Sequence, residues 1–420
     1  VCNQYIERIE KFEKDVKAWQ YFDKKKLLEK ALEADEHRKS GKPLGSLHGL
    51  PIAVKDIIGT FEMPTECGSP LRKKMPSSQD SEIVNLLKIE GAIVMGKTVT
   101  TELAYFHPGK TTNPHDNTRT PGGSSSGSAA VIAAHMAPLS IGTQTNGSVI
   151  RPASYCGVVG YKPSYGLISR SGVMRQSDKL DHIGVFGKTV EDVALFAKSL
   201  IKKDLYDPST IHYAADEMLN VCKKGPIYEP KFIFYKTKNW KNIDKESQKS
   251  FDFFIKTFSK NIEVFDTPSY FDDIPKYHKI IHETDMANNF QGYYKKSKKF
   301  LSKEMVSAIE RGLKYSAKEY AEAIDFMKRS YESYKEVFED FHGVLTPSSS
   351  GVAPKGLKST GSPEFSTIWT YMGLPSISLP LLIGANNLPL GIQLVGDKLD
   401  DLRFLGVANW LEKNCKKYAK

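Results

Sequence analysis

The sequence predicts an α/β fold, with a parallel or mixed β-sheet and helices on its faces in one large domain. Between Leu50 and Thr98, a strand-like apolar run, a helical period and a second strand-like run follow one another, which is the order of a βαβ unit. The chain has 420 residues, 40% of them hydrophobic and 26% charged, and no stretch with the composition of a long linker. These values are typical of a globular protein that folds by itself.

The first 46 residues are predicted to be helical. Apolar residues recur at helical spacing through residues 3–40 among Lys and Glu, which indicates two amphipathic helices packed on a core. A helical arm that binds a partner is the alternative. From Leu50 a β-branched apolar run ends in Lys55 and Asp56, followed by a helical period over 81–90 and a strand over 91–98.

The Gly/Ser-rich segment Gly122–Ser128 is predicted to be a tight loop that opens a buried helix. It follows the turn-forming residues 113–121 and continues into the apolar run Ala129–Ala134. A flexible linker would not lead directly into a core helix. Further strands are predicted at the end of the run 137–141 and over 157–163 and 184–187, followed by a helix over 191–201.

The composition changes after residue 201. Residues 202–340 are rich in Lys, Phe and Tyr and poor in Gly, with long helical periods, so we expect a mainly helical cover on the substrate side of the sheet. Residues 341–420 return to strand and turn patterns that complete the core. A single domain, 1–420, is therefore expected to divide into N-terminal helices (1–46), a core segment (47–201), the helical cover (202–340) and a C-terminal segment (341–420).

Charge and cysteine content point away from several classes of partner. The formal net charge is +10, but only ten of the 59 basic residues are Arg and the lysines are scattered, so we expect a solvated surface and no nucleic acid. Five cysteines without a CxxC pair predict neither disulfides nor a zinc site, and favour a cytoplasmic location. No apolar run reaches the roughly 18 residues of a membrane span, and the first residues do not resemble a signal peptide. The chain begins at Val1 and not at Met, which weakens the last inference.

The stretch Gly142–Pro152 is the first candidate for a site. A short apolar run stops there in Gly, Thr, Gln and Asn and then presents Ser148, as when a buried strand gives way to a tight turn. Such a turn exposes a hydroxyl and backbone N–H groups together. These are the nucleophile and the oxyanion donors that acyl transfer requires.

Two other kinds of site are weaker. Gly123–Gly127 matches the nucleophile-elbow pattern G-x-S-x-G, with Ser125 as nucleophile, but residues 113–121 are not the strand that an elbow needs. His282 and Glu283 begin a near match to the metal-binding pattern H-E-x-x-H, but Met286 replaces the second histidine. We therefore expect no metal.

Lys55 is the candidate base. A lysine at the end of an apolar strand is desolvated, which lowers its pKa. At the reference pKa near 10.4, about one lysine in 2,500 is neutral at pH 7, so a useful base needs a pKa lower by roughly two to three. The alternative is that Lys55 pairs with Asp56 or reaches solvent.

Together these motifs resemble the amidase signature family of serine hydrolases, and most of all its small bacterial members of the malonamidase type. The resemblance runs from about Leu47 to Leu411 and is strongest over Gly49–Gly187. Its motifs, in order, are Val54–Asp56, Gly96–Thr98, Pro121–Ala130, Gly142–Ala153, Gly160–Ser164, Gly373–Pro375 and Gly391–Gln393.

The resemblance implies the amidase signature fold, a central twisted mixed sheet with helices on both faces, and a Ser-cisSer-Lys triad that needs no cofactor. In the matching positions, Ser148 is the nucleophile, Ser124 is the bridging serine after a cis peptide bond, and Lys55 is the base. The two serines are 24 residues apart, as in the family. The oxyanion would be held by backbone N–H groups of four successive residues, Thr145, Asn146, Gly147 and Ser148.

Substrate contacts are less well defined. Asn146 departs from the family, in which this position usually carries Gly; Asn tolerates left-handed backbone, so the change bears on the pocket and not on the chemistry. Arg151 matches an arginine that grips a substrate carboxylate in the malonamidase type, and the alternative is that it ties down the loop through carbonyls or an acidic residue. Ser125 is expected beside the substrate or in support of the loop.

The resemblance leaves three functions open. The first is hydrolysis of a small amide, with a carboxylate-bearing amide as one candidate, to an acid and ammonia or an amine through an acyl-enzyme. The second is the glutaminase subunit of a tRNA-dependent amidotransferase. The third, from another class, is an inactive binding or scaffold protein. For the first, we expect a small-molecule amide as partner, no nucleic acid, no membrane, and a homodimer as in the family.

Overall fold

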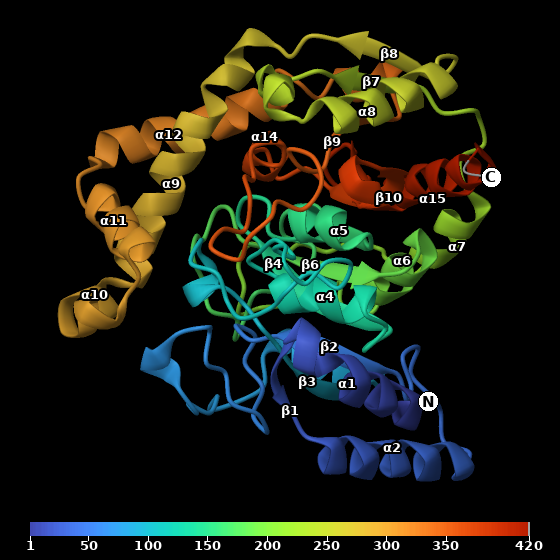
Figure 1. Ribbon diagram of the computed structural model, residues 1–420, viewed down its shortest axis with the longest axis vertical. Helices are drawn as coiled ribbons and strands as arrows, with labels where there is room; N and C mark the ends of the chain where they lie inside the picture. Colours follow the sequence, from blue (N-terminus) through green and yellow to red (C-terminus); the bar gives the residue numbers. More distant parts are fainter. Residues whose placement is uncertain (419–420) are drawn as a thin grey trace.

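One mixed β-sheet organises the chain in the computed structural model, which describes residues 1–418 (Figure 1). Its eleven strands lie in the order β1-β3-β2-β4-β6-β5-β10-β11-β9-β7-β8. They are β1 (Trp19–Phe22), β2 (Pro51–Lys55), β3 (Ile93–Thr98), β4 (Leu139–Gln144), β5 (Val159–Lys162), β6 (His182–Gly187), β7 (Phe232–Tyr235), β8 (Ile262–Phe265), β9 (Gly343–Pro347), β10 (Ser376–Ile383) and β11 (Pro389–Val395).

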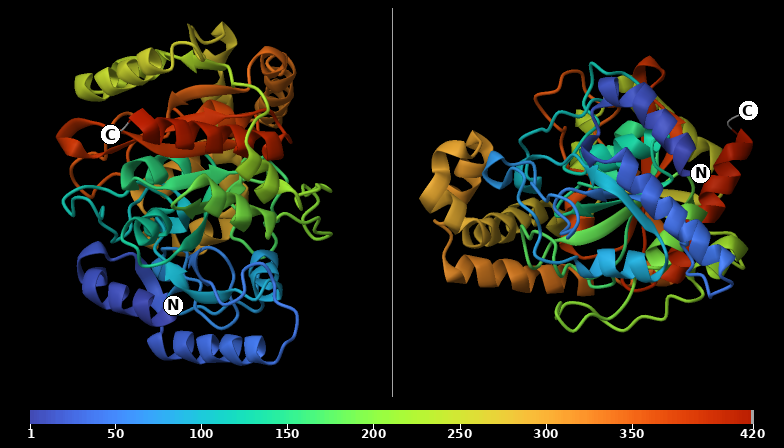
Figure 2. Two further views of the ribbon diagram at one scale, coloured as in Figure 1. Left: turned by 90° about the vertical axis from the view of Figure 1, so that its right-hand side faces the viewer. Right: turned by 90° about the horizontal axis from the view of Figure 1, so that it is seen from below.

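Helices cover both faces of this sheet (Figure 2). They are α1 (Cys2–Val16), α2 (Lys24–Lys39), α3 (Glu82–Ile89), α4 (Ser126–Ala133), α5 (Ile150–Cys156), α6 (Val190–Lys198), α7 (Met218–Lys224), α8 (Lys245–Thr257), α9 (Ile274–Asn289), α10 (Gln291–Ser297), α11 (Lys303–Gly312), α12 (Ala317–Glu332), α13 (Val337–Asp340), α14 (Thr367–Tyr371) and α15 (Asp401–Tyr418). No helix among residues 1–418 is long and apolar enough to cross a membrane.

Two hydrophobic cores lie on opposite faces of the sheet. Ile52 and Val54 in β2 pack into one core, and Ala53 between them packs into the other. Val185 and Phe186 in β6 separate in the same way. Because successive side chains of a strand point to opposite faces, this division requires cover on both sides. The predicted α/β fold with a mixed sheet is confirmed.

The predicted βαβ unit is present, and it positions the site. Strands β2 and β3 pair in parallel around α3, and β2 also pairs in parallel with β4, with Val54 opposite Ile141. The carboxyl ends of parallel strands lie at the same edge of a sheet. Lys55, the last residue of β2, therefore lies beside the loop that follows β4.

The buried helix after the Gly/Ser-rich loop is also present, as α4. All its residues from Ser126 to Ile132 are buried, so the run of small and apolar residues has no polar face to expose. Gly127 allows the close packing, because a Cβ atom there would lie 2.4 Å from the carbonyl oxygen of Ala18.

The first structural difference from the expectation concerns Trp19, one of the apolar residues at helical spacing within residues 3–40. Helix α1 ends at Val16, followed by Lys17 in a left-handed conformation. The Glu13 carboxylate then accepts hydrogen bonds from the backbone N–H groups of Ala18 and Trp19 at 2.9 Å each. Trp19 consequently begins β1, which pairs with β3 in antiparallel fashion.

The second difference is in residues 202–340, which are not only a helical cover. They also contribute β7 and β8 at one edge of the sheet. The helices α9, α11 and α12 extend along one side of the molecule, with α10 at the far end (Figure 1). Of these, α9 packs against α14 and lies next to the candidate site described below.

Candidate active site

Lys55, Ser124 and Ser148 come from three separate segments. Lys55 ends β2, Ser124 lies in the loop before α4, and Ser148 lies in the loop that joins β4 to α5. The Nζ atom of Lys55 lies 2.7 Å from the Ser124 Oγ atom and 2.7 Å from the Thr143 Oγ1 atom. Lys55 and Ser124, which are 69 positions apart in the sequence, are thus within hydrogen-bond distance.

The environment of Lys55 disfavours its charged form. The side chain is fully buried, and this desolvation lowers its pKa well below the ordinary value, opposed by the charge of Asp181. A neutral amine donates through its N–H groups and accepts through one lone pair. With one N–H donated to Thr143, the lone pair is available to accept the proton of Ser124. Lys55 does not pair with Asp56, because Asp56 lies beside Lys97, 3.5 Å from its Nζ atom.

Ser124 is buried and held in place through its backbone. The Gly123–Ser124 peptide bond is cis, as the resemblance implies. The carbonyl oxygen of Gly123 accepts a hydrogen bond of 2.7 Å from Nη2 of Arg151, and the carbonyl oxygen of Ser124 accepts one from the N–H of Thr101. The hydroxyl of Ser124 therefore stays at the end of the Lys55 side chain.

Ser148 lies at the end of a turn with free donors. Within residues 1–418, no backbone N–H from Thr145 to Ser148 donates a hydrogen bond to the protein. The following N–H groups, of Val149 and Ile150, donate to the Gln144 side-chain oxygen at 2.8 and 3.0 Å. Ser148 is partly exposed, unlike Ser124. The turn thus presents a reachable hydroxyl next to unpaired N–H groups, as an oxyanion site requires.

Asn146 does not need the left-handed conformation that the sequence suggested, because its φ is not positive. Its side-chain oxygen accepts a hydrogen bond of 2.8 Å from Thr367 in α14. Its amide is therefore anchored to a neighbouring helix.

Arg151 fits both interpretations of its role. One nitrogen, Nη2, ties down the Gly123 carbonyl, as the loop-supporting interpretation expected. The other two, Nε and Nη1, are buried and have no hydrogen-bond partner. Burial lowers the pKa of Arg151 to about 10. A buried guanidinium with unpaired donors is costly unless an anion binds to it.

A narrow cavity of about 20 Å³ joins Arg151 to Ser148. Its volume is close to that of one water molecule, so its walls lie near the serine. The walls also include residues that the sequence did not indicate, namely Tyr105, Phe106, Gln176 and Pro363. They include His282 as well, which the sequence indicated only as part of a near match to a metal-binding pattern. His282 belongs to α9 and lies within hydrogen-bond distance of Gln176, at 3.1 Å.

Two of the weaker alternatives do not form a site. Ser125 is fully buried, and its hydroxyl bonds only to the backbone of Thr143, donating to the carbonyl at 3.1 Å and accepting from the N–H at 3.2 Å. It supports the loop and does not line the cavity, so a direct substrate contact by Ser125 is not supported. In residues 1–418 no three His, Cys, Asp or Glu side chains are grouped to hold a metal ion.

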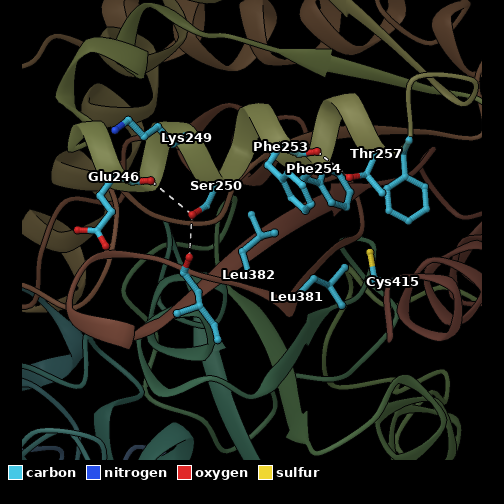
Figure 3. Close-up of a pocket in the computed structure, with 11 residues that line it drawn as sticks. Glu246, Lys249, Ser250, Phe253, Phe254, Thr257, Leu381, Leu382 and Cys415 are labelled. Carbon is cyan, nitrogen blue, oxygen red and sulfur yellow. Dashed lines mark hydrogen bonds between the residues drawn. The ribbon is translucent and has the colours of Figure 1, made fainter. Parts of the chain in front are cut away.

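A second cavity lies far from this chemistry. It has a volume of about 420 Å³ and is formed by α8, the end of β10 and Cys415 (Figure 3). Phe253, Phe254 and Leu382 make its walls mainly apolar. Because it holds no nucleophile with a base, we do not assign it to catalysis.

This fold, with a fully buried lysine in contact with a serine beside a turn of free N–H groups, fits the class of enzymes that act on amide C–N bonds. The chain matches the Amidase family over residues 1–405 and belongs to it. Family membership makes the chain an enzyme of amide C–N bonds and disfavours the scaffold alternative.

Comparison with individual proteins narrows the choice. The chain is 32% identical to the A-type subunit of the glutamyl-tRNA(Gln) amidotransferase of Alkaliphilus metalliredigens and 33% identical to that of Fusobacterium nucleatum, covering 98% of this chain and 92% of each relative. The crystal structure of the corresponding protein from Thermotoga maritima superposes with a TM-score of 0.81 at 27% identity, covering 99% of this chain and 91% of that one. A protein described as an amidase superposes with a TM-score of 0.85 at 26% identity, covering 98% and 95%.

These relatives correct one expectation. The scattered lysines led us to expect no nucleic-acid partner and only a small-molecule substrate. That prediction is wrong, because relatives that match nearly the whole chain are named as subunits of an enzyme of glutamyl-tRNA. Net charge and arginine content report only on direct phosphate contacts by this chain. They carry no information about a nucleic acid that acts within a larger assembly.

Proposed function

We propose that this chain releases ammonia from a small primary amide that carries a carboxylate, as the glutaminase subunit of a tRNA-dependent amidotransferase. Its full-length similarity to proteins of that name supports the assembly. The observation that carries the chemistry is the contact of 2.7 Å between the fully buried Nζ atom of Lys55 and the Oγ atom of Ser124.

In this proposal the proton moves along the triad. Neutral Lys55 accepts the proton of the Ser124 hydroxyl, and Ser124 accepts that of Ser148. The Ser148 Oγ atom then forms a bond to the amide carbon, and the carbonyl electrons move onto the oxygen, which the N–H groups of Thr145–Ser148 stabilise. The C–N bond breaks as Lys55 returns the proton through Ser124 to the leaving nitrogen. Ammonia departs, and water releases the acid from Ser148.

Arg151 defines the substrate class in this proposal. Its unpaired Nε and Nη1 atoms face no carboxylate in residues 1–418, and it lines the cavity beside Ser148. A substrate carboxylate there would accept charge-assisted hydrogen bonds from both atoms. Glutamine is a small primary amide with such a carboxylate. Residues 47–201 then carry the catalytic groups, and α9, within residues 202–340, carries part of the substrate wall.

A hydrolase that works without partners is the second candidate. The structural match to the protein described as an amidase supports it. A cytoplasmic location, expected from the cysteines, stays a prediction.

Ammonia release separates the two candidates. The purified chain is assayed with glutamine and with a panel of small amides, each with and without a free carboxylate. The assays are repeated with the other amidotransferase subunits and glutamyl-tRNA. Release from glutamine that depends on the partners supports the proposal. Rapid release from another amide by the isolated chain, with glutamine inert throughout, supports the second candidate.

A further inference from the structure

The loop Thr145–Ser148 is held by its carbonyl oxygens. The carbonyl oxygen of Thr145 lies 2.9 Å from Nε2 of His278 in α9. The carbonyl oxygen of Asn146 accepts a hydrogen bond of 2.6 Å from the hydroxyl of Thr370 in α14. The carbonyl oxygen of Gly147 accepts one of 3.0 Å from the N–H of Arg151 in α5. Three different helices thus hold three successive peptide groups.

Because a carbonyl can only accept, His278 must donate through Nε2–H. Burial lowers the pKa of His278 to about 4, so near neutral pH it is an uncharged donor of fixed tautomer. His278 is 2% exposed, and Thr370 is fully buried. Thr370 is itself fixed, since its oxygen accepts a hydrogen bond of 2.9 Å from the side-chain nitrogen of Gln144.

Because a peptide group is planar, a hydrogen bond that fixes its carbonyl also fixes the direction in which its N–H group points. In a trans peptide, the C=O of one residue and the N–H of the next lie in one plane and point in opposite directions. Fixing the Thr145 carbonyl therefore fixes the N–H of Asn146, and fixing the Asn146 carbonyl fixes the N–H of Gly147. Without an anchor, either peptide group can rotate and turn its N–H away from Ser148.

We propose that His278 and Thr370 are positioning residues that aim the N–H groups of Asn146 and Gly147 at the oxyanion formed on Ser148. The inference rests on the proposed role of the loop in catalysis. It holds for any acyl group, because neither side chain needs to touch the substrate. Helix α9 then has two separable tasks. His278 orders the oxyanion loop, and His282, one turn further on, lines the cavity where the acyl group binds.

The test compares His278→Phe, which keeps a ring but removes the donor, with His278→Gln, which keeps an N–H donor. Thr370→Val removes the second anchor at nearly constant volume. The control is Lys279→Ala, an exposed neighbour of His278 on α9. Enzyme concentration is taken from titration of Ser148 with a fluorophosphonate, so that unfolded protein does not count. The readouts are kcat, KM and the rate of phosphonylation, whose tetrahedral product places an oxygen in the same loop.

Removal of one oxyanion donor typically lowers kcat by about 10²–10³-fold, and a misdirected donor is expected to cost about 10–100-fold. His278→Phe and Thr370→Val should lower kcat and the phosphonylation rate by similar factors, with KM changed by less than about threefold. His278→Gln should recover most of this loss, and Lys279→Ala should be unaffected.

The inference is overturned if His278→Phe and Thr370→Val keep kcat within about threefold, if their loss lies in KM, or if Gln is no better than Phe. Should His278→Phe fail to fold, Thr370→Val and His278→Gln still decide the matter. A chain that cleaves no amide but whose phosphonylation responds to these variants refutes the proposed function and supports the inference.

Discussion

Lys55 allows the most direct test of the chemistry. Lys55→Met keeps the length of the side chain and its burial but removes the amine that contacts Ser124 and Thr143. General-base catalysis contributes about 10²–10⁴-fold to the rate. We expect kcat/KM to fall by about 10³-fold, which corresponds to about 4 kcal/mol of transition-state stabilisation.

The lowered pKa of Lys55 predicts the direction in which activity and stability change with pH. Protonated Lys55 cannot accept the proton of Ser124, so activity should fall tenfold per pH unit below the pKa of Lys55 in the folded protein. Burial lowers that pKa below 10.5, which moves the fall toward neutral pH. In the unfolded chain Lys55 stays protonated up to about pH 10.4. Between its pKa in the folded protein and this value, the unfolded chain therefore binds more protons, so the free energy of unfolding should rise with pH. Lys55→Met should lack both the activity limb and this rise.

The assay is the pH–rate profile of ammonia release, beside urea unfolding at matched pH values. Lys162→Met is the matched control, since Lys162 is also fully buried and burial lowers its pKa to about 7. Its Nζ atom donates to the carbonyl oxygens of Pro163 and Leu374, and not to Ser124 or Ser148. An acid limb that survives in Lys55→Met, or that disappears in Lys162→Met, would refute the assignment of the base.

Three further predictions follow from the same geometry. Ser148→Ala should abolish labelling by a fluorophosphonate and Ser125→Ala should not, as mass spectrometry of the labelled chain can check; labelling of Ser148→Ala at Ser125 would restore the elbow alternative. Arg151→Met should raise KM by about 10–100-fold for an amide with a carboxylate, through loss of hydrogen bonds worth about 1.5–3 kcal/mol. Steady-state kinetics with a matched uncharged amide is the control. If the substitution leaves the ratio of the two KM values unchanged, Arg151 is purely structural. A carboxylate oxygen of Asp207 lies 3.0 Å from Nε of Arg170. Burial raises the pKa of Asp207, but hydrogen bonds and the charge of the Arg170 guanidinium outweigh burial and hold this pKa below its ordinary value. The contribution of Asp207 to stability is therefore complete above about pH 4 and is lost as the pH falls further. Asp207→Asn should cost about 3–5 kcal/mol in urea unfolding at pH 7 and flatten the acid dependence, and an unchanged unfolding curve would contradict this.

The sequence was sufficient for the parts of the fold with short-range patterns. The βαβ unit around α3 and the buried helix α4 follow from runs of apolar residues bounded by Gly, Ser and turns, because both signals are local. Trp19 shows the limit of such patterns. Its spacing fits a helix, but the Glu13 side chain and the pairing with β3 end the helix before it.

The residues that hold the loop Thr145–Ser148 could not be identified from the sequence in the same way. His278 bonds to Thr145 across 133 residues, and Thr370 bonds to Asn146 across 224. No spacing rule links such positions. A single histidine or threonine on a helix has the same local signature whether it is structural or functional.

The sequence by itself was enough to nominate the candidate reacting groups, because a turn that exposes Ser148 and a lysine at the end of an apolar strand are both patterns of particular residue types within a few positions. Only the tertiary structure decided how these groups are arranged and what surrounds them. Burial of Lys55, its distance to Ser124, the unpaired nitrogens of Arg151 and the side chains that hold the loop Thr145–Ser148 depend on which segments pack together. That packing is a property of the whole sheet and its two layers of helices, and no short window of sequence contains it.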